Sequence, residues 1–526
     1  MPNTQVFSRS TPGKLVEPTD AVNNAGGVAY ALSDEAALAT LCCTGTIHNT
    51  YYVDAAAQFN DVMELCDKVT PAFIAKAAIY SRTKGFMKDM PCLLLAILLT
   101  KDTALFKKAF PKVIDNVKML RSFVQIMRSG AIGRKSFGGA AKKCIRQWFA
   151  GWKDANKFFN STVGNNPSIG DIIRLTHPKP QNQEFEALFA YLCGFPYDAE
   201  KLPEIVKRYE LFKKNYAEGI IWQETPDINF QYLTSLPLTQ ANWADIACKA
   251  SWQTTRMNLN AFAKHSVFVL DANDTPMVDI VANRLRDPKE IAKAKVFPYQ
   301  LLQAFKMADD LPHNIREALQ DAMEISVSNV PTIKGKVIIA IDSSGSMDSP
   351  VTGNRGAQTS KVLCQDVAGL VGAAIKRKNP DAVVLSFDMS ARKETVNSRD
   401  SVMTIAKQLS RSGGGTDISC AIRLCNDENI NGDLFVIVSD NESWFDRGGY
   451  TRGTWSMAEW NKFKVRNPNA RCVCIDIQPN RTTQLKERDD ITNIGGFSDN
   501  VFSLLATLTE GSNENHFVNT INGVEM

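Results

Sequence analysis

Residues 31–330 carry amphipathic segments, each separated from the next by a short break at Pro or Gly. Apolar positions spaced three and four apart are typical of helices that bury one face. The pattern predicts helices over 33–43, 54–67, 71–83, 91–100, 103–110, 112–128, 138–150, 168–175, 181–193, 201–214, 238–248, 256–264, 275–284, 288–293, 297–307 and 312–327. Many short helices with few strand signals indicate an α-solenoid of helix pairs. Because no strict repeat period is visible, an irregular helical domain is the alternative.

The hydrophobic pattern changes after residue 335. Short β-branched apolar runs alternate there with amphipathic helical segments, which predicts strands buried on both faces of a mostly parallel sheet. The expected strands are Val337–Ile341, Asp381–Phe387, Leu434–Val438 and Arg471–Ile477, with Ala391–Val396 as an antiparallel edge and helices at Ser360–Lys376 and Met457–Val465. This pattern indicates a doubly wound α/β domain.

These patterns divide the chain into three parts. We predict an extended lead-in over 1–30, an α-helical repeat domain over 31–332 and the α/β domain over 333–526. Val330-Pro331 is a natural linker between the last helix of the repeat domain and the first strand of the sheet. The fold class is therefore α plus α/β.

Oxygen-bearing side chains follow two of the predicted buried strands. Asp342, Ser344 and Ser346 come directly after Val337–Ile341 in the spacing Asp-x-Ser-x-Ser, and Asp440 follows Leu434–Val438. The glycine-rich loop before the second of these strands adds Thr416. In open α/β sheets, ligands bind at the carboxyl ends of the strands. Hydroxyl and carboxylate oxygens suit Mg²⁺, so these residues predict a site for Mg²⁺ or another divalent cation.

Taken alone, Asp-Ser-Ser-Gly-Ser is more typical of a turn that caps a helix than of a metal site. The order of strand, motif, Gly-Gly-Gly-Thr-Asp loop and second strand favours the metal site over the turn. The arrangement resembles the metal-ion-dependent adhesion site of von Willebrand factor A domains. Many such domains have Asp-Gly after the second of these strands, whereas this chain has Asp440-Asn441-Glu442.

Composition narrows the class of protein further. The chain has 526 residues, of which 44% are hydrophobic and 22% charged, as in soluble globular proteins. Twelve Cys without a Cys-x-x-Cys pair and five scattered His argue against a zinc site and for reduced thiols. The polar first twenty residues lack a signal-peptide core, and the longest aliphatic run, Leu93–Leu99, is too short to cross a membrane. We expect a cytoplasmic protein without membrane contact.

Positive charge is concentrated in one region. Residues 101–150 hold twelve Lys and Arg against two Asp, although the whole chain carries a net charge of only +4. In the segment 138–150, Ala141, Cys144, Ile145 and Trp148 form one apolar stripe, which leaves the bases Lys142, Lys143 and Arg146 toward solvent. The preceding glycine-rich stretch adds Arg134 and Lys135. Exposed bases with few acidic neighbours suit phosphate, whereas a merely solvated helix face is the alternative.

A second basic cluster follows at the end of the segment 168–175. Ser168 caps the predicted helix, and Pro178 ends it. Arg174, His177 and Lys179 gather around this end. Beside Arg and Lys, a histidine is a candidate RNA contact through phosphate or base stacking, although a lone histidine is more often structural.

The sequences Asp-Ile-Ile-Arg-Leu-Thr-His-Pro-Lys-Pro at 171–180 and Ser-Asp-Asn-Glu-Ser-Trp at 439–444 make the resemblance specific. With a helical domain before an A domain, nearly the whole chain resembles the Ro autoantigen family, in its bacterial form a Ro ribonucleoprotein with a TROVE module. The resemblance implies a ring of HEAT-like helical repeats. It also implies binding of small noncoding Y-like RNAs and of single-stranded ends of misfolded or structured RNAs, with an exoribonuclease as a partner in RNA decay. It extends to His177, Arg174 and Lys179, and to the basic helix with Lys142, Lys143 and Arg146.

Three functions are compatible with these observations. The first is a noncatalytic RNA-binding protein of the Ro type, monomeric apart from its RNA, that acts in RNA quality control. The second is a protein-interaction adaptor that grips an acidic partner through the metal of its A domain. The third is a metal-dependent hydrolase at Asp342 and Asp440, which lacks a clear general base. We expect the first, without enzymatic activity.

Overall fold

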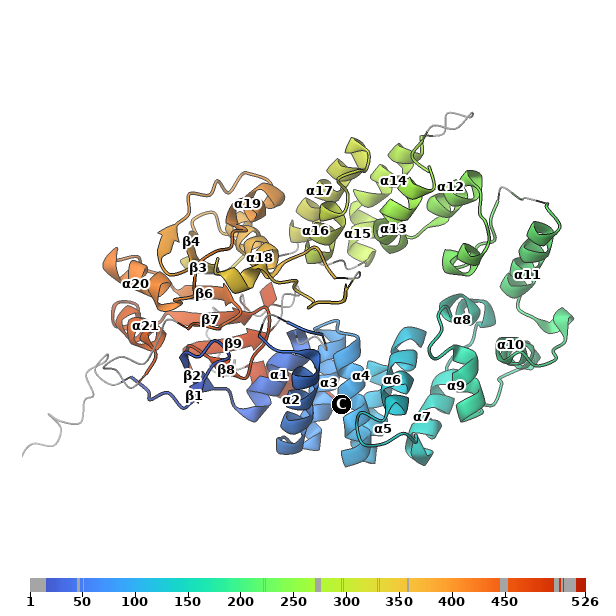
Figure 1. Cartoon of the computed structure of the whole chain (residues 1–526), viewed down its shortest axis with the longest axis horizontal. Coiled ribbons are helices and arrows are strands. Elements are labelled where there is room, and N and C mark those ends of the chain that lie inside the picture. The colour runs from blue at the N-terminus through green and yellow to red at the C-terminus, as the bar shows by residue number, and fades with distance from the viewer. Residues whose placement is uncertain are drawn as a thin grey trace, which may run out of the picture. The chain divides into compact units, whose positions relative to one another are not determined.

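The structure is a computed structural model of the whole chain (Figure 1). It describes residues 16–44, 48–50, 52–220, 222, 224–269, 276–294, 296, 298–328, 330, 332–356, 359–444, 453–495, 501–502, 505 and 517–526. The chain forms two compact units. The sheet unit comprises residues 1–90, 297–303 and 323–525, and the helical unit comprises residues 91–296 and 304–322. The predicted division at residues 332 and 333 stays a prediction about sequence modules, since the compact units interleave along the chain.

The sheet unit is built on a six-stranded sheet in the order β5-β4-β3-β6-β7-β9 (Figure 1). All neighbouring pairs are parallel except β4 and β5. The strands are β3 (Val337–Asp342), β4 (Val383–Phe387), β5 (Ala391–Lys393), β6 (Leu434–Ser439), β7 (Arg471–Asp476) and β9 (Ile491–Gly495). The strand order reverses between β3 and β6, which is where open α/β sheets bind ligands. This confirms the mostly parallel sheet and its antiparallel edge.

Helices cover both faces of this sheet. On one face, α18 (Cys364–Lys378) packs on β3, β4 and β6, and α19 (Val402–Leu409) packs on α18. On the other face, α20 (Ser419–Asp427) and α21 (Trp455–Arg466) share an apolar core with the strands, in which Trp460 is fully buried. A Cβ on Gly372 of α18 would lie 2.4 Å from Ile341 Cδ1, so only glycine lets α18 approach β3 this closely.

The lead-in forms strands, where the sequence predicts only an extended segment. β1 (Ala21–Val22) and β2 (Val28–Ala31) make a hairpin, and β2 pairs antiparallel with β8 (Thr482–Thr483). Residues 1–15 of the lead-in lie outside the described residues. The unit is completed by α1 (Asp34–Thr44), α2 (Ala55–Lys68), α3 (Pro71–Thr83), α23 (Phe517–Asn522) and the short η4 (Gly345–Asp348). Helix α1 packs on β9, and α23 packs on α1 and α3.

The helical unit follows the predicted series of short helices. It contains α5 (Thr103–Val113), α6 (Val117–Ser129), α7 (Gly138–Ala150), α8 (Ala155–Ser161), α9 (Ile169–Thr176), α10 (Gln183–Cys193), η2 (Ala199–Lys201), α11 (Glu204–Ala217), η3 (Phe230–Ser235), α12 (Gln240–Lys249), α13 (Trp252–Lys264), α14 (Met277–Leu285) and α15 (Pro288–Ala294). Three further helices cross the boundaries of the units: α4 (Asp89–Lys101), α16 (Pro298–Lys306) and α17 (His313–Ser328). The helix-rich region is thus confirmed, and its closure into a ring stays a prediction.

Local capping explains several of these helices. Asn116 accepts a hydrogen bond from Met119 N and so starts α6. The ring of Phe123 in α6 packs against Phe106 and Phe110 of α5. The predicted break at Pro111 is wrong, because this proline lies in the last turn of α5 and the helix continues to Val113. A proline so near the end of a helix removes a single backbone hydrogen bond.

Two further boundaries differ from the prediction. Helix α8 was not expected, and Asp154 starts it by accepting a hydrogen bond from Lys157 N. The helix expected from Ser360 begins at Cys364 instead. Leu363 forms an isolated bridge with Pro350, and its N–H donates to Asp366 Oδ2 at 2.8 Å, so the residues before Cys364 stay extended.

Candidate functional site

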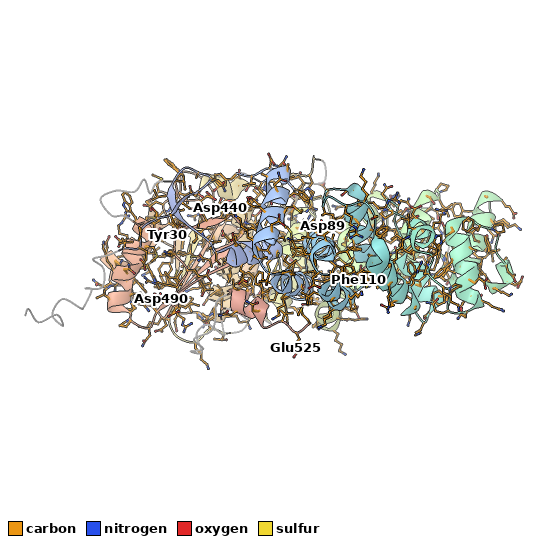
Figure 2. All side chains as sticks on the ribbon, turned by 90° about the horizontal axis from the view of Figure 1, so that it is seen from below. Tyr30, Asp89, Phe110, Asp440, Asp490 and Glu525 are labelled. Carbon is orange, nitrogen blue, oxygen red and sulfur yellow. The ribbon has the colours of Figure 1, made fainter. Side chains whose placement is uncertain are left out.

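The five residues of the predicted metal site are buried in the sheet unit, four of them at the carboxyl ends of β3 and β6 and Thr416 on the glycine-rich loop before α20. Asp342 is the last residue of β3, and Asp440, which Figure 2 labels, directly follows β6. The relative exposure of Asp342, Ser344, Ser346, Thr416 and Asp440 is 5% or less. These polar side chains are held inside the fold, where an ordinary capping turn would leave them in water.

Hydrogen bonds join the first motif to the second strand. Asp342 Oδ1 accepts from Ser344 N at 2.8 Å, and Asp342 Oδ2 accepts from the Ser439 hydroxyl at 2.5 Å. The hydroxyls of Ser344 and Ser346 lie 3.2 Å apart, and Ser346 lies close enough to Asp440 to lower the pKa of its carboxyl. The structure therefore brings together four of the predicted residues. Ser439 is a partner that the sequence pattern did not single out.

The glycine-rich loop is pinned to this site. Gly345 N donates to Gly414 O at 3.1 Å, and Gly413 N donates to Ser343 O at 2.9 Å. The Ser443 hydroxyl donates to the backbone carbonyl of Thr416 at 2.9 Å, which ties the loop to the segment after β6. Gly414 has a φ of +77°, a backbone conformation that favours glycine. Thr416 thus lies on a loop that is fixed to this site from two sides.

Joint ionisation of Asp342 and Asp440 is unfavourable at this buried site. Burial raises the pKa of Asp342 to about 7, and the neighbouring Asp440 carboxylate contributes to that shift. Burial likewise raises the pKa of Asp440. Two like charges in a low-dielectric site disfavour joint ionisation, whereas a cation between them would favour it. Two carboxylates with three hydroxyls form an all-oxygen set that fits Mg²⁺ chemically.

Two more buried carboxyl groups lie beside this pair, and the sequence pattern did not single them out. Glu442 accepts hydrogen bonds from Asn24 Nδ2 at 3.0 Å and from Ala25 N at 3.2 Å, both in the lead-in hairpin. Burial and the nearby Asp440 raise the pKa of Glu442 to about 8. Asp476, at the end of β7, is 1% exposed, and burial raises its pKa well above the ordinary value. Within the part of the chain that the structure describes, no cluster of three or more His, Cys, Asp or Glu is arranged to hold a metal. A cation here would therefore depend on the hydroxyls.

The predicted basic residues lie in the helical unit, on helices that pack together. Helix α5 packs on α7, and α9 packs on both α6 and α7. Arg146 Nε of α7 donates to the carbonyl of Thr176, the last residue of α9, at 2.6 Å. This bond joins the cluster of Lys142, Lys143 and Arg146 to the end of α9, where His177 and Lys179 are exposed. The two basic clusters predicted separately therefore form one surface.

Most of the lysines on this surface have no acidic partner. Among the described residues, Lys107, Lys108, Lys118, Lys142 and Lys143 make no ion pair. Helix α7 buries most of its predicted apolar stripe, since Ala141, Cys144 and Ile145 are buried, whereas Trp148 is half-buried. The lysine side chains therefore extend from helices whose apolar faces are packed in the core.

Some arginines of this region are engaged within the protein. Arg174 Nη1 pairs with Asp171 at 3.1 Å, and its Nη2 donates to Cys193 O at 2.5 Å. Arg121 donates to the carbonyls of Val163, Asn165 and Pro167. These two guanidinium groups hold loops in place, so a count of bases in the sequence overstates the charge that is available to a ligand.

Arg134 and Lys135 lie on the connector between α6 and α7, as predicted. Arg134 Nε donates to Ser136 O at 2.7 Å, and a Cβ on Gly138 would lie 2.3 Å from Arg134 Nη2. The side chain of Lys135 folds over Gly130, where a Cβ would lie 2.7 Å from Lys135 Cε. The glycines of this connector therefore make room for its two bases, and Lys135 stays exposed.

No helix among the described residues is both long and apolar enough to cross a membrane. The run Leu93–Leu99 is instead buried inside α4, as expected.

Comparisons with known proteins agree on one family. Residues 336–509 match the family described as the Ro60 vWA domain. The chain is 24% identical to the "RNA-binding protein RO60" of Deinococcus radiodurans over 543 residues, which cover 92% of this chain and 94% of that protein. The crystal structure of the Deinococcus radiodurans RO (RSR) protein has the same fold, with a TM-score of 0.61 and 19% identity over 90% of this chain and 99% of that one. This chain is therefore similar to Ro proteins over nearly its whole length.

Proposed function

We propose that this protein binds RNA through the basic surface formed by α5, α7 and the end of α9. The observation that carries the proposal is the bond from Arg146 to Thr176 O, which unites two basic clusters into one surface. Lysines without carboxylate partners suit a backbone that carries one negative charge per nucleotide. The relative from Deinococcus radiodurans is named an RNA-binding protein, which supports the same ligand.

The preferred RNA combines structure with a single-stranded end. An array of exposed lysines binds phosphates without reading sequence, so it suits small noncoding RNAs of the Y type and misfolded RNAs. The protein acts in this proposal as a noncatalytic partner in RNA quality control, which hands the RNA to an exoribonuclease. Nuclease assays of the purified protein with and without Mg²⁺ test the absence of catalysis, and metal-dependent RNA cleavage would contradict it.

The decisive experiment is filter binding of a structured RNA with a single-stranded 3′ tail across a salt series. The variant Lys142→Ala/Lys143→Ala/Arg146→Ala/His177→Ala removes four groups of the surface. The control variant Lys361→Ala/Lys393→Ala/Lys407→Ala removes three lysines from exposed positions of the sheet unit. It therefore matches the two lysines and one arginine that the first variant removes besides His177. We expect tight, salt-dependent binding that only the first variant loses. Weak binding that is equal in all three proteins would overturn the proposal.

We also propose that Asp342, Ser344, Ser346, Thr416 and Asp440 hold Mg²⁺ or another divalent cation. The buried carboxylate pair with raised pKa values supports this, since a cation relieves the repulsion that burial imposes. The bound cation would offer a coordination position to an acidic group of a partner. A second candidate function, a metal-dependent adaptor for proteins, rests on this site alone.

A further inference from the structure

Two aromatic rings of the helical unit are exposed where most of their neighbours are buried. The side chains of Phe195 and Tyr197 are 56% and 43% exposed. Both lie on the connector between α10 and η2. By contrast, Phe158, Phe185 and Phe189 of the same unit are buried and pack edge to face or tilted against one another. Burying a ring of this size stabilises a fold by about 2 kcal/mol, so packing does not explain why these two stay in solvent.

The connector is held in a defined conformation. Gly194 ends α10 in the left-handed region with a φ of +69°, and Phe195 N donates to Ala190 O at 2.9 Å. Pro196 between the two aromatic residues fixes its own φ. The ring of Tyr197 stands against the edge of Tyr191 at a centroid distance of 5.4 Å. Tyr191 is in turn fixed, because its hydroxyl donates to Glu210 Oε1 at 2.5 Å.

Arg174 connects this pair to the basic surface. Its guanidinium carbon lies 5.9 Å from the centre of the Phe195 ring, and Asp171 and Cys193 O fix the same guanidinium. Arg174 comes from the last turn of α9, directly before the exposed His177 and Lys179. A ring that stacks under a cation at the edge of a basic surface is thus already oriented before any ligand binds.

The acidic residues near the rings would direct the phosphates and the bases of a nucleic acid to different sides. Asp198 and Glu200 follow Tyr197, and Asp198 pairs with Lys201 at 3.4 Å. Carboxylates repel phosphate, so the backbone of a nucleic acid would follow the α9 side, where His177 and Lys179 lie. The rings would then face the bases. Flat apolar faces beside phosphate-binding groups match single-stranded RNA, whose unpaired bases stack on aromatic side chains, whereas the bases of a duplex are already stacked.

We propose that Phe195 and Tyr197 form a stacking platform for the unpaired bases of single-stranded RNA. This inference rests on the proposed function, since the phosphates of the same strand are held by the basic surface. The platform makes the protein select single-stranded segments beyond what charge alone provides. It also explains the role of Arg174, which orients the Phe195 ring and is already engaged by the protein.

The test uses the full chain and a hairpin RNA with a single-stranded 3′ tail that carries one 2-aminopurine. The fluorescence of this base falls when it stacks on an aromatic ring. The variant Phe195→Ala/Tyr197→Ala removes both rings, and Phe195→Trp/Tyr197→Trp restores flat aromatic faces. Phe86→Ala is the matched control, because Phe86 is 42% exposed and lies in the sheet unit. Circular dichroism confirms that each variant keeps its helices.

We expect the double alanine variant to bind the tailed RNA about 10- to 100-fold more weakly than the wild type and to lose the quenching. Its affinity for a blunt duplex and its salt slope should stay unchanged, and the tryptophan variant should recover the quenching. Wild-type RNA binding with equal quenching in the alanine variant would overturn the platform alone and leave the rings as a protein contact. Absence of RNA binding by the wild type would overturn the proposed function and the platform with it.

Discussion

The basic surface of the helical unit and the acidic site of the sheet unit use charge in opposite ways. On α5 and α7, the ammonium groups of lysines are exposed and reach solvent on flexible side chains. At the ends of β3 and β6, Asp342 and Asp440 are buried, and the Ser439 hydroxyl donates a hydrogen bond to Asp342. The first arrangement keeps its charges hydrated, whereas the second accepts the cost of removing two carboxylates from water.

This difference has a consequence for ligands. Exposed charges act as a sum, are screened by salt within about 10 Å, and tolerate the loss of any single member. Buried charges act as a set, because each group is positioned by the others and leaves a defined space between them. We therefore expect the helical unit to accept varied RNAs with graded affinity and the sheet unit to accept one kind of ion.

Reversing charge on the basic surface should give the largest effect. Lys107 and Lys108 of α5 are exposed, so Lys107→Glu/Lys108→Glu leaves the fold intact, removes two phosphate contacts and adds repulsion. We expect RNA affinity to fall about 100-fold at low salt, and the salt slope to shrink by about 0.7 for each lost contact with a single strand. Filter binding across a salt series measures both quantities.

The control for this prediction is Lys393→Glu/Lys407→Glu, which makes the same change in net charge at exposed positions of the sheet unit. An equal loss of affinity in both variants would mean that only the total charge matters, and the comparison between a basic surface and the rest of the chain would fail.

Removing one carboxylate from the buried site should have the next largest effect. At a Mg²⁺ concentration about 100 times its dissociation constant, binding stabilises the wild type by about 2.7 kcal/mol. We expect this to raise the unfolding temperature of the sheet unit by about 4 °C, and Asp440→Asn to abolish the rise. In the presence of a chelator, we expect Asp440→Asn to be more stable than the wild type, because the variant no longer buries two like charges. Thermal unfolding with and without Mg²⁺ measures both effects, with the exposed Asp381→Asn as a control.

The same measurement has a defined pH dependence. Because burial raises the pKa of Asp342 from 3.8 to about 7, the folded protein binds a proton between these values that the unfolded chain has released. In a chelator, wild-type stability should therefore fall as pH rises from about 4 to about 7, and Mg²⁺ should reduce this loss. A chelated wild type whose stability rises over this range would contradict the account of the buried pair.

The two regions also differ in how far the sequence predicts them. The buried strands, the Asp-x-Ser-x-Ser motif and its partner Asp440 follow from local pattern, because parallel strands bring their carboxyl ends to one edge. Asp476 and the contact of Asn24 with Glu442 depend on pairing between distant segments, which no local pattern encodes. The lead-in hairpin was missed for that reason.

On the helical side, the apolar stripe of α7 and the capping of α9 by Ser168 were predictable. The use of Arg174 and Arg121 was not, since their partners are backbone carbonyls of loops and any residue type supplies those. The exposure of Phe195 and Tyr197 was also not predictable, because Gly194-Phe195-Pro196-Tyr197 has no periodic pattern. The composition predicted that this surface is positively charged. Only the packing shows which of its Lys and Arg side chains are available to a ligand.

The smallest effect separates charge from geometry at one residue. Arg146 carries a positive charge and also joins α7 to the end of α9 through its Nε bond to Thr176 O. Arg146→Lys keeps the charge and removes this bond, which stabilises the contact by about 1 kcal/mol. We expect a loss of RNA affinity of about 5-fold with an unchanged salt slope. Arg146→Gln removes the charge as well, so its slope should fall by about 0.7. If both variants lower the slope equally, Arg146 acts through geometry, and the helices must move for the phosphate contacts to form.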